Sequence, residues 1–328
     1  MLSRKLISKL IALCVGLFCV FIAYNSNSNK TYSISGNAYG TSWSIVSSSY
    51  IADHHEKNII KIIDHIDFVA SNYKINSEIA IINKQPTNTE LYISNDLYNI
   101  LNIAEDINKL SNGAYNIMLG KVSSKLGFAP DFNMDLIQDK EDGYLLTNDN
   151  KLIKQSKNWF DLSSIAKGYA VQLIHEYLIT NNLTNHLIDI GGELIVNGSN
   201  HSTPWMIGIQ DPNSFNDKAI HVIKNNDNFL AIATSGEYRN FKISDNKMIT
   251  HTIDPKTLLS IDSKILSVTI AHEESATQAD AMATAFNVIG YPDALNIAND
   301  NNIAMMLVIG SEGESELIYS NKWYDLGL

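Results

Sequence analysis

The sequence predicts an α+β fold in which helices pack against mixed β-sheets. Short runs rich in β-branched residues recur along the chain, and several alternate partly between apolar and polar residues, as strands do. Four longer segments instead repeat apolar residues with helical spacing. Because strand runs and helical segments do not alternate regularly, an α+β arrangement fits better than a doubly wound parallel sheet.

The strand runs begin with a hairpin or strand pair and end with a terminal hairpin around the turn sequence "SEGES". They cover residues 33–48, 186–198, 205–212, 229–236, 248–255, 265–272, 304–310 and 316–320.

The four helices are expected over residues 52–71, 95–111, 163–181 and 275–290. The second begins at Ser94, an N-cap residue type, and stops at Gly113. The fourth opens with Ser275 and Gln278, which have the spacing of a capping box, and ends at a glycine.

The chain has 328 residues, of which 45% are hydrophobic, enough for a sizeable core. Residues 1–30 hold four of the 24 basic residues and none of the 35 acidic ones, so the remainder has a net charge of about −15 (20 basic against 35 acidic). This excludes a general nucleic-acid binder, which needs clustered Lys and Arg. No linker is evident, so residues 31–328 are expected to form one compact unit.

Residues 1–30 are predicted to be a signal or anchor segment followed by a polar spacer. Basic residues precede an apolar run from Leu10 to Ala23, which has signal-peptide length and is short for an ordinary transmembrane helix. The positive flank should stay in the cytoplasm, which sends the rest of the chain across the membrane. Both cysteines, Cys14 and Cys19, lie in this segment, so the exported part has no thiol. Cleavage, retention as an anchor and lipidation all stay open.

Common nucleotide and hydrolase fingerprints are absent, and three polar stretches stand out instead. The first is "DLSSIAKGYA", from Asp161 to Ala170. A helix start near Ser163 would favour an anion, Lys167 adds positive charge, and Gly168 lets another backbone or a ligand come close. The structural alternative is a capped helix with a surface lysine.

The second stretch is "ITHTIDPKT", from Ile249 to Thr257, in which His251 lies near the end of a strand. A histidine there can act as a general base near neutral pH, although a lone histidine in a strand is more often structural. The third is "QADAMATA", in which Asp280 and Thr284 are one helical turn apart. The pair offers two oxygens to Mg²⁺ or Ca²⁺, or else Asp280 offsets the helix dipole and Thr284 bonds its own backbone.

In combination and in this order, these stretches resemble the ApbE family, the FAD:protein FMN transferases. The resemblance covers nearly all of residues 31–328. The matching segments are "YGTSWSI" at 39–45, "SNYKINSEIAIIN" at 71–83, "YNIMLGKVSSKLGF" at 115–128, "DLSSIAKGYAV" at 161–171, "IDIGGELIVNG" at 188–198, "WMIGIQDP" at 205–212, "IATSGEYRNF" at 232–241, "THTIDPKT" at 250–257 and "QADAMATAFNVIG" at 278–290.

The resemblance implies an ApbE-like fold and a Mg²⁺-dependent enzyme on the periplasmic side of the bacterial inner membrane. Such an enzyme cleaves the pyrophosphate of FAD, attaches FMN to a Thr or Ser hydroxyl of a flavin-bearing subunit of a membrane redox complex, and releases AMP. By position, Asp280 and Thr284 resemble the Mg²⁺ ligands, with the main-chain carbonyl of Ser164 as a third, and His251 matches the base. The positions that match FAD contacts are Tyr39, Tyr73, Asp161, Lys167 and Ile253.

The chain departs from the family pattern at several positions. Asn116 to Gly120 stand where Asp-Pro-Thr-Val-Gly is common, Leu126 replaces a tryptophan, and Ala283 replaces a second carboxylate near the metal. Leu258 replaces a glycine, which is expected to change that turn. These departures bear on FAD affinity and metal binding more than on the fold.

Three other functions fit the same residues. Water could replace the acceptor hydroxyl, making the protein an FAD pyrophosphatase; the protein could bind or store FAD without transfer; or it could be a cation-binding structural protein. The acceptor, the oligomeric state and the preferred divalent cation are not determined by the sequence.

Overall fold

The computed structural model describes residues 30–132, 134–139, 143–214, 218–225, 228–236, 241–244, 247–261, 264–311 and 314–328, together with Val15 and Leu17. The predicted signal or anchor segment therefore lies almost wholly outside the described residues. Within them, no helix is both long and apolar enough to span a membrane.

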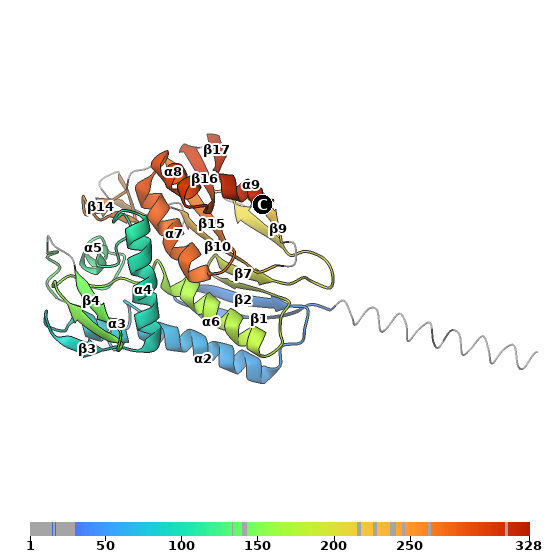
Figure 1. The fold of residues 1–328 in the computed structure, drawn as a ribbon, viewed down its shortest axis with the longest axis horizontal. Helices are drawn as coiled ribbons and strands as arrows, with labels where there is room; N and C mark the ends of the chain where they lie inside the picture. The colour runs from blue at the N-terminus through green and yellow to red at the C-terminus, as the bar shows by residue number, and fades with distance from the viewer. Residues whose placement is uncertain are drawn as a thin grey trace, which may run out of the picture.

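An eight-stranded sheet forms the centre of the molecule (Figure 1). Every pair of neighbouring strands in it is antiparallel. Its strands, in spatial order, are β1 (Tyr32–Ala38), β2 (Thr41–Ser47), β6 (His186–Ile190), β7 (Glu193–Asn197), β10 (Leu230–Gly236), β15 (Ile265–His272), β16 (Ala304–Ser311) and β17 (Glu314–Tyr319).

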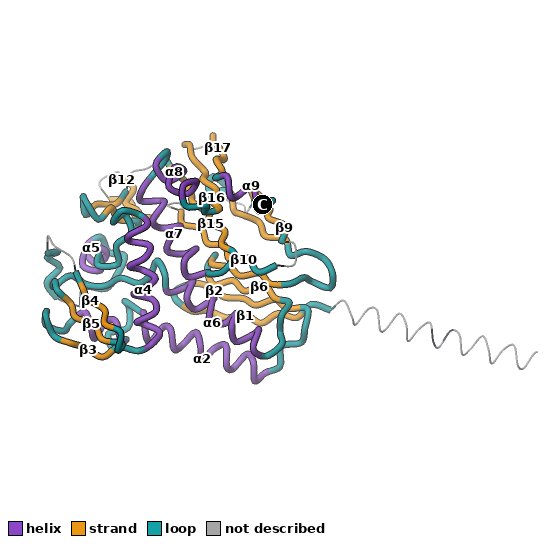
Figure 2. Tube along the Cα trace, viewed as in Figure 1, coloured by secondary structure: helices purple, strands orange, loops and turns teal. Residues whose placement is uncertain are grey.

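One face of this sheet is covered by helices (Figure 2). The covering helices are α2 (Asp53–Ala70), α6 (Ala166–Thr180) and α7 (Ala276–Ile289), and α4 (Asn95–Leu110) packs on α2 and α7. Alternate strand residues such as Ile195 and Leu307 point into this main core, where they meet Phe286 of α7. Ile59, Ile63 and Ile66 of α2 are buried there as well, whereas Ile60 is exposed.

The opposite face of the sheet has a smaller core. The strand residues of the other parity, including Val196 and Met306, lie here beside Trp323. The cover is a two-stranded ribbon, β8 (Met206–Gln210) and β9 (Ala219–Lys224), with the short helix α9 (Asn321–Asp325). Strand alternation thus builds two cores on one sheet.

The remaining elements are short. They are α3 (Glu78–Asn83), α5 (Gly120–Lys125), α8 (Asp293–Asp300), a sheet of β3 (Glu90–Tyr92), β5 (Lys151–Lys154) and β4 (Tyr144–Thr147), and two pairs, β11 (Phe241–Ser244) with β12 (Lys247–Thr250) and β13 (Ile253–Asp254) with β14 (Leu259–Ser260).

The four predicted helices are present, and their start signals are partly confirmed. Ser94 Oγ accepts a hydrogen bond from Leu97 N, and Ser275 Oγ accepts one from Gln278 N. The terminal hairpin is confirmed as β16–β17. The third helix was placed too early: residues 163–165 form turns, and α6 begins at Ala166. Ser163 N donates to Asp161 Oδ1, a turn-type bond that competes with helix formation.

Candidate active site

The start of α6 lies against the first half of α7, and Gly168 makes this contact possible. A Cβ atom at position 168 would collide with the carbonyl oxygen of Ala276 and would lie 2.7 Å from the Cβ of Asp280. Gly168 N donates instead to Asp280 Oδ2 at 2.9 Å. The expectation that Gly168 allows a close approach is confirmed, and the partner is a helix of the same chain.

The Gly168–Asp280 bond leaves the Ser164 carbonyl outside the helical ladder. In a continuous helix Gly168 N would donate to the carbonyl four residues earlier, but here that donor is used by Asp280. Within the described residues, the Ser164 carbonyl accepts no other backbone bond. Thr284, one turn after Asp280, is half-buried, and its hydroxyl makes no bond with the described residues. The alternative expected for Thr284, a hydrogen bond from its hydroxyl to its own backbone, is therefore not present among the described residues.

Two carboxylates and one ammonium group meet beside this contact. Lys167 Nζ lies 2.5 Å from Glu193 Oε1, and both Glu193 and Asp280 are almost fully buried. Burial raises the pKa of Glu193 to about 7; the charge of Lys167 opposes the shift and that of Asp280 adds to it. Burial also raises the pKa of Asp280, against the effects of Lys167 and the Gly168 N–H. With both carboxylates ionised, one negative charge is left without a partner.

This donor set fits a hard divalent cation. A carboxylate, a hydroxyl and an unengaged carbonyl are oxygen ligands of the kind that Mg²⁺ and Ca²⁺ take, and a cation would offset the excess negative charge. The described residues contain no group of three or more His, Cys, Asp or Glu side chains placed to hold a metal ion. A site here would therefore hold at most two such side chains, and the one that the sequence suggests is Asp280, with Ala283 in place of a second carboxylate.

Glu193 reaches this position because β7 begins directly after the Gly191–Gly192 turn, which takes positive φ angles of 65° and 104°. Gly191 N donates to Ser42 O in β2, and a Cβ at Gly191 would lie 2.6 Å from the Thr41 methyl group. The tips of the β1–β2 and β6–β7 hairpins therefore meet beside the charged cluster.

Tyr39 occupies the β1–β2 turn, and an open cavity is lined by residues 37–42. Its hydroxyl donates to the Ile63 carbonyl of α2, and burial raises its pKa. That hydroxyl is therefore engaged by the scaffold, and only the rest of the residue is left to face a ligand in the cavity.

Asp161 connects the charged cluster to a second group of residues. Its negative charge raises the pKa of Tyr115 and of Tyr73, in both cases after the larger effect of burial. Tyr115 is buried, and its hydroxyl lies 3.1 Å from Ser164 Oγ. Tyr73 is 66% exposed, and its hydroxyl donates to Phe128 O at 2.5 Å. Tyr73 and Phe128 form a partly exposed aromatic rim, and the charge of Asp161 acts on Tyr73 in it.

His251 lies on this rim. Its ring is 6.2 Å from the ring of Phe128 in an edge-to-face arrangement, and the Lys242 ammonium lies over the same phenyl ring. Lys242 also donates to the Gly127 carbonyl. Four segments far apart in the sequence, containing Tyr73, Phe128, Lys242 and His251, therefore converge here.

Ile253 follows His251 but turns inward. Its side chain is buried in a small cluster with Leu119 and Val122 of the α5 region. Only the main chain of Ile253 is therefore left to contact a ligand. The packed side chain holds the segment that follows His251 in place.

Leu258 keeps the turn that a glycine would favour. It adopts a φ of 58°, and its N–H donates to the Asp254 carbonyl at 2.8 Å. Leu258 packs against the Ile253 cluster in this left-handed conformation, and its expected effect on the turn stays a prediction. In the segment from Asn116 to Gly120, which also departs from the family pattern, Asn116 Oδ1 accepts a hydrogen bond from Met118 N. The Asn116 amide therefore stabilises its own loop.

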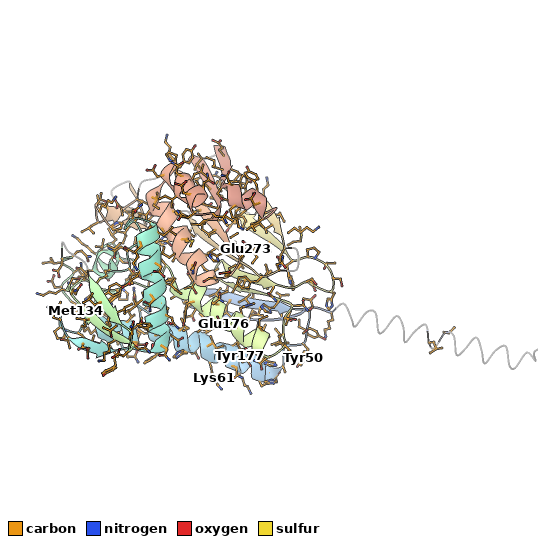
Figure 3. All side chains as sticks on the ribbon, in the orientation of Figure 1. Tyr50, Lys61, Met134, Glu176, Tyr177 and Glu273 are labelled. Carbon is orange, nitrogen blue, oxygen red and sulfur yellow. The ribbon has the colours of Figure 1, made fainter. Side chains whose placement is uncertain are left out.

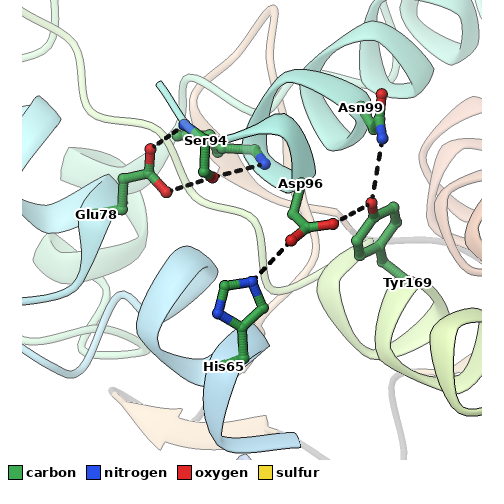
Figure 4. Close-up of polar contacts among 7 residues, drawn as sticks. His65, Glu78, Ser94, Asp96, Asn99 and Tyr169 are labelled. Carbon is green, nitrogen blue, oxygen red and sulfur yellow. Dashed lines mark hydrogen bonds and ion pairs between the residues drawn. The ribbon is translucent and has the colours of Figure 1, made fainter. Parts of the chain in front are cut away.

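A second polar network lies on the other side of α6 (Figure 4). Asp96 accepts from Tyr169 OH at 2.8 Å and lies 2.7 Å from His65 Nε2, which joins α2, α4 and α6. His55, also on α2, pairs with the hydroxyl of Tyr177, which is labelled in Figure 3. Each of these histidines thus has a partner on a neighbouring helix.

The sequence interpretation missed Glu193 and Tyr115 as site residues. A signal for Glu193 was present, since a carboxylate directly follows a Gly-Gly pair inside the apolar run 188–196. No pattern identifies Tyr115, because its role depends on the fold bringing Ser164 to it.

Comparisons with known proteins agree with this geometry. The profile of the ApbE family matches residues 39–307. The FAD:protein FMN transferase of Haemophilus influenzae is 30% identical over 94% of each chain, and that of Vibrio cholerae is 28% identical over 85% of this chain and 87% of its own. The solved flavin transferase ApbE from Vibrio cholerae superposes with a TM-score of 0.78 at 26% identity, over 90% of this chain and 99% of that one.

The predicted α+β fold and the resemblance to flavin transferases are thereby confirmed. With a family profile that spans most of its length, the chain belongs to the ApbE family.

Proposed function

We propose that this protein is a Mg²⁺-dependent FAD:protein FMN transferase. The observation that carries the proposal is the junction of α6 and α7, where Gly168 N donates to Asp280 and the adjacent Lys167 pairs with Glu193. Oxygen ligands next to a cationic group suit a pyrophosphate substrate. Relatives that align along nearly the whole chain are named for this activity.

In the proposed reaction, the hydroxyl oxygen of an acceptor Thr or Ser attacks the phosphorus of the FMN half of FAD. The bond from that phosphorus to the AMP oxygen breaks, and AMP leaves with the electron pair. His251 takes the proton of the attacking hydroxyl, which its place on the exposed rim allows. Mg²⁺ bound by Asp280, Thr284 and the Ser164 carbonyl would supply charge neutralisation at the phosphate oxygens.

The other residues of the site bind and orient FAD. Lys167 supplies positive charge for the phosphates, and Asp161 and the Ile253 main chain contact the nucleotide. Tyr73 and Tyr39 line the pockets for the flavin or adenine rings, which suits the exposed ring of Tyr73 and the cavity beside Tyr39.

We place the enzyme on the periplasmic side of the bacterial inner membrane, carried there by the basic and apolar residues 1–30, with residues 31–328 as the catalytic domain. Its acceptors are flavin-bearing subunits of membrane redox complexes.

The test is incubation of the purified protein with FAD, Mg²⁺ and a flavin-free acceptor subunit, followed by measurement of acceptor mass and of AMP. We expect covalent FMN on a Thr or Ser and an equal amount of AMP, both abolished by EDTA. Free FMN with AMP, formed equally without the acceptor, would identify a pyrophosphatase. Bound FAD without AMP would identify a carrier.

A further inference from the structure

The two carboxylate oxygens of Glu193 have different surroundings. Oε1 forms the 2.5 Å ion pair with Lys167, whereas Oε2 is shielded from solvent and has no hydrogen-bond partner among the described residues. The whole residue is only 4% exposed. An ionised oxygen in such a place is costly unless a donor reaches it, so the arrangement is incomplete in the free protein.

The fold itself does not require a carboxylate at this position. Glu193 lies on the same face of β7 as Ile195, which is fully buried in the main core under the helices. An apolar residue would continue that pattern at lower cost. The charge at position 193 therefore serves something other than packing.

The surroundings of Oε2 indicate what kind of group is missing. When Glu193 is ionised, this oxygen can be satisfied by a hydrogen-bond donor or by a cation, and the ionised oxygens of a pyrophosphate are neither. FAD carries hydroxyl groups on both sides of its pyrophosphate, on the ribityl chain and on the ribose. The Gly191–Gly192 turn just before Glu193 has no side chains of its own.

Building on the proposed function, we propose that Glu193 is a positioning residue with two roles. Its Oε1 holds the Lys167 ammonium in place for the phosphates, and its Oε2 accepts a hydrogen bond from a hydroxyl group of bound FAD.

The first role is tested by a double-mutant cycle on transfer kinetics with Glu193→Gln, Lys167→Met and the double variant. If Glu193 acts through Lys167, Glu193→Gln lowers kcat about tenfold in the wild-type background and less than about twofold in the Lys167→Met background. Equal reductions in both backgrounds, or no reduction in either, would overturn this role.

Glu78→Gln is the matched control. The Glu78 carboxylate accepts bonds from Ser94 N and Ser94 Oγ at 2.6 Å each, so it is a bonded glutamate in the scaffold. Its replacement should lower Tm and leave kcat and KM unchanged. Glu193→Gln should show the reverse, with an unchanged or higher Tm, because a buried charge is removed. Glu193→Asp, which keeps the charge, should recover part of the lost kcat.

The second role is tested by equilibrium titration with FAD and with ADP in the absence of Mg²⁺, which needs no turnover. Glu193→Gln, with an amide donor where the acceptor was, should weaken FAD binding about tenfold. Unchanged ADP affinity would assign the hydroxyl to the ribityl chain, and an equal loss for ADP would assign it to the ribose. Unchanged affinity for both ligands would overturn the role. A wild-type protein that binds FAD but transfers nothing would refute the proposed function and still leave this titration decisive.

Discussion

Two polar clusters flank the first turns of α6 and differ in how fully their groups are bonded. On the side of α2 and α4, both oxygens of Asp96 have partners, one in Tyr169 and one in His65. On the side of α7 and β7, Glu193 has one buried oxygen without a partner. Lys167 and Tyr169, two residues apart, thus point into clusters of opposite character.

The difference separates a structural network from a binding site. A bonded, partly exposed network such as that of Asp96 adds stability and holds three helices together. A buried cluster with excess negative charge and an unpaired acceptor lowers stability in the free protein, and a ligand that completes it recovers that cost. The contrast predicts opposite outcomes when each cluster is disrupted.

The largest effect is expected from Asp280→Ala. Transfer should fall about 10³-fold, since the only carboxylate ligand of the proposed cation site is lost. The thermal midpoint without Mg²⁺ should stay the same or rise, because a buried charge disappears. Activity assays and calorimetry on the same preparation measure both. A variant that transfers at the wild-type rate would refute the site.

A smaller loss is expected from His251→Ala, about 10²-fold in transfer at neutral pH, because general-base catalysis contributes that much. FAD affinity in a fluorescence titration should change less than about twofold, since the proposed role is proton transfer. If FAD affinity falls as much as the rate does, His251 is a binding residue and not the base.

A third polar pair, formed by two buried histidines, predicts that the stability of the protein depends on pH. His175 Nδ1 lies 2.9 Å from His186 Nε2, whose ring also bonds the Leu183 carbonyl. Burial lowers the pKa of each to about 4 from an ordinary 6.5. The unfolded chain thus binds more protons between these values, so stability is complete above pH 6.5 and is lost as the pH falls toward 4.

The loss from His186 should be on the order of 3 kcal/mol, and that from the more exposed His175 smaller. Urea unfolding at pH 7 and pH 4.5 measures it. His186→Gln should make the difference in unfolding free energy between pH 7 and pH 4.5 smaller. An unchanged difference would show that His186 is not the source of the pH dependence.

The smallest effect is expected from Asp96→Ala, which leaves Tyr169 and His65 without their acceptor. Stability should fall by about 1–2 kcal/mol, a few degrees in Tm, with kcat and KM for transfer unchanged. Asp96→Asn should lose less, because the amide oxygen still accepts one bond. Impaired transfer in a variant that remains folded would show that the two clusters are coupled.

Much of the fold could be predicted because its long elements carry clear periodicity. The buried residues of α2 repeat over about three turns from Ile59 to Val69, and Ser94 and Ser275 mark helix starts by their side-chain chemistry. The short helices α3, α5, α8 and α9 were not predicted, because five to eight residues do not establish a period. The start of α6 was misplaced because Asp161 and Ser163 form a turn before it.

Candidate site residues could be proposed where the chemistry depends on local spacing, as for Asp280 and Thr284, which lie one turn apart on α7. Glu193 was harder, because its significance comes from Lys167 and Asp280, which only the tertiary fold brings to it. The burial of the Ile253 side chain and the left-handed Leu258 likewise follow from packing against α5, which no local pattern records.

The bond from Gly168 to Asp280 also has a consequence for folding. The two residues are 112 positions apart, and strands β6, β7, β10 and β15 lie between α6 and α7 in the sequence. A site closed by such distant segments exists only in the completed fold, since contacts of long sequence separation form late and with large loss of chain entropy. A ligand of this site would therefore bind only the native state, and its stabilisation of that state would grow with the logarithm of the ligand concentration.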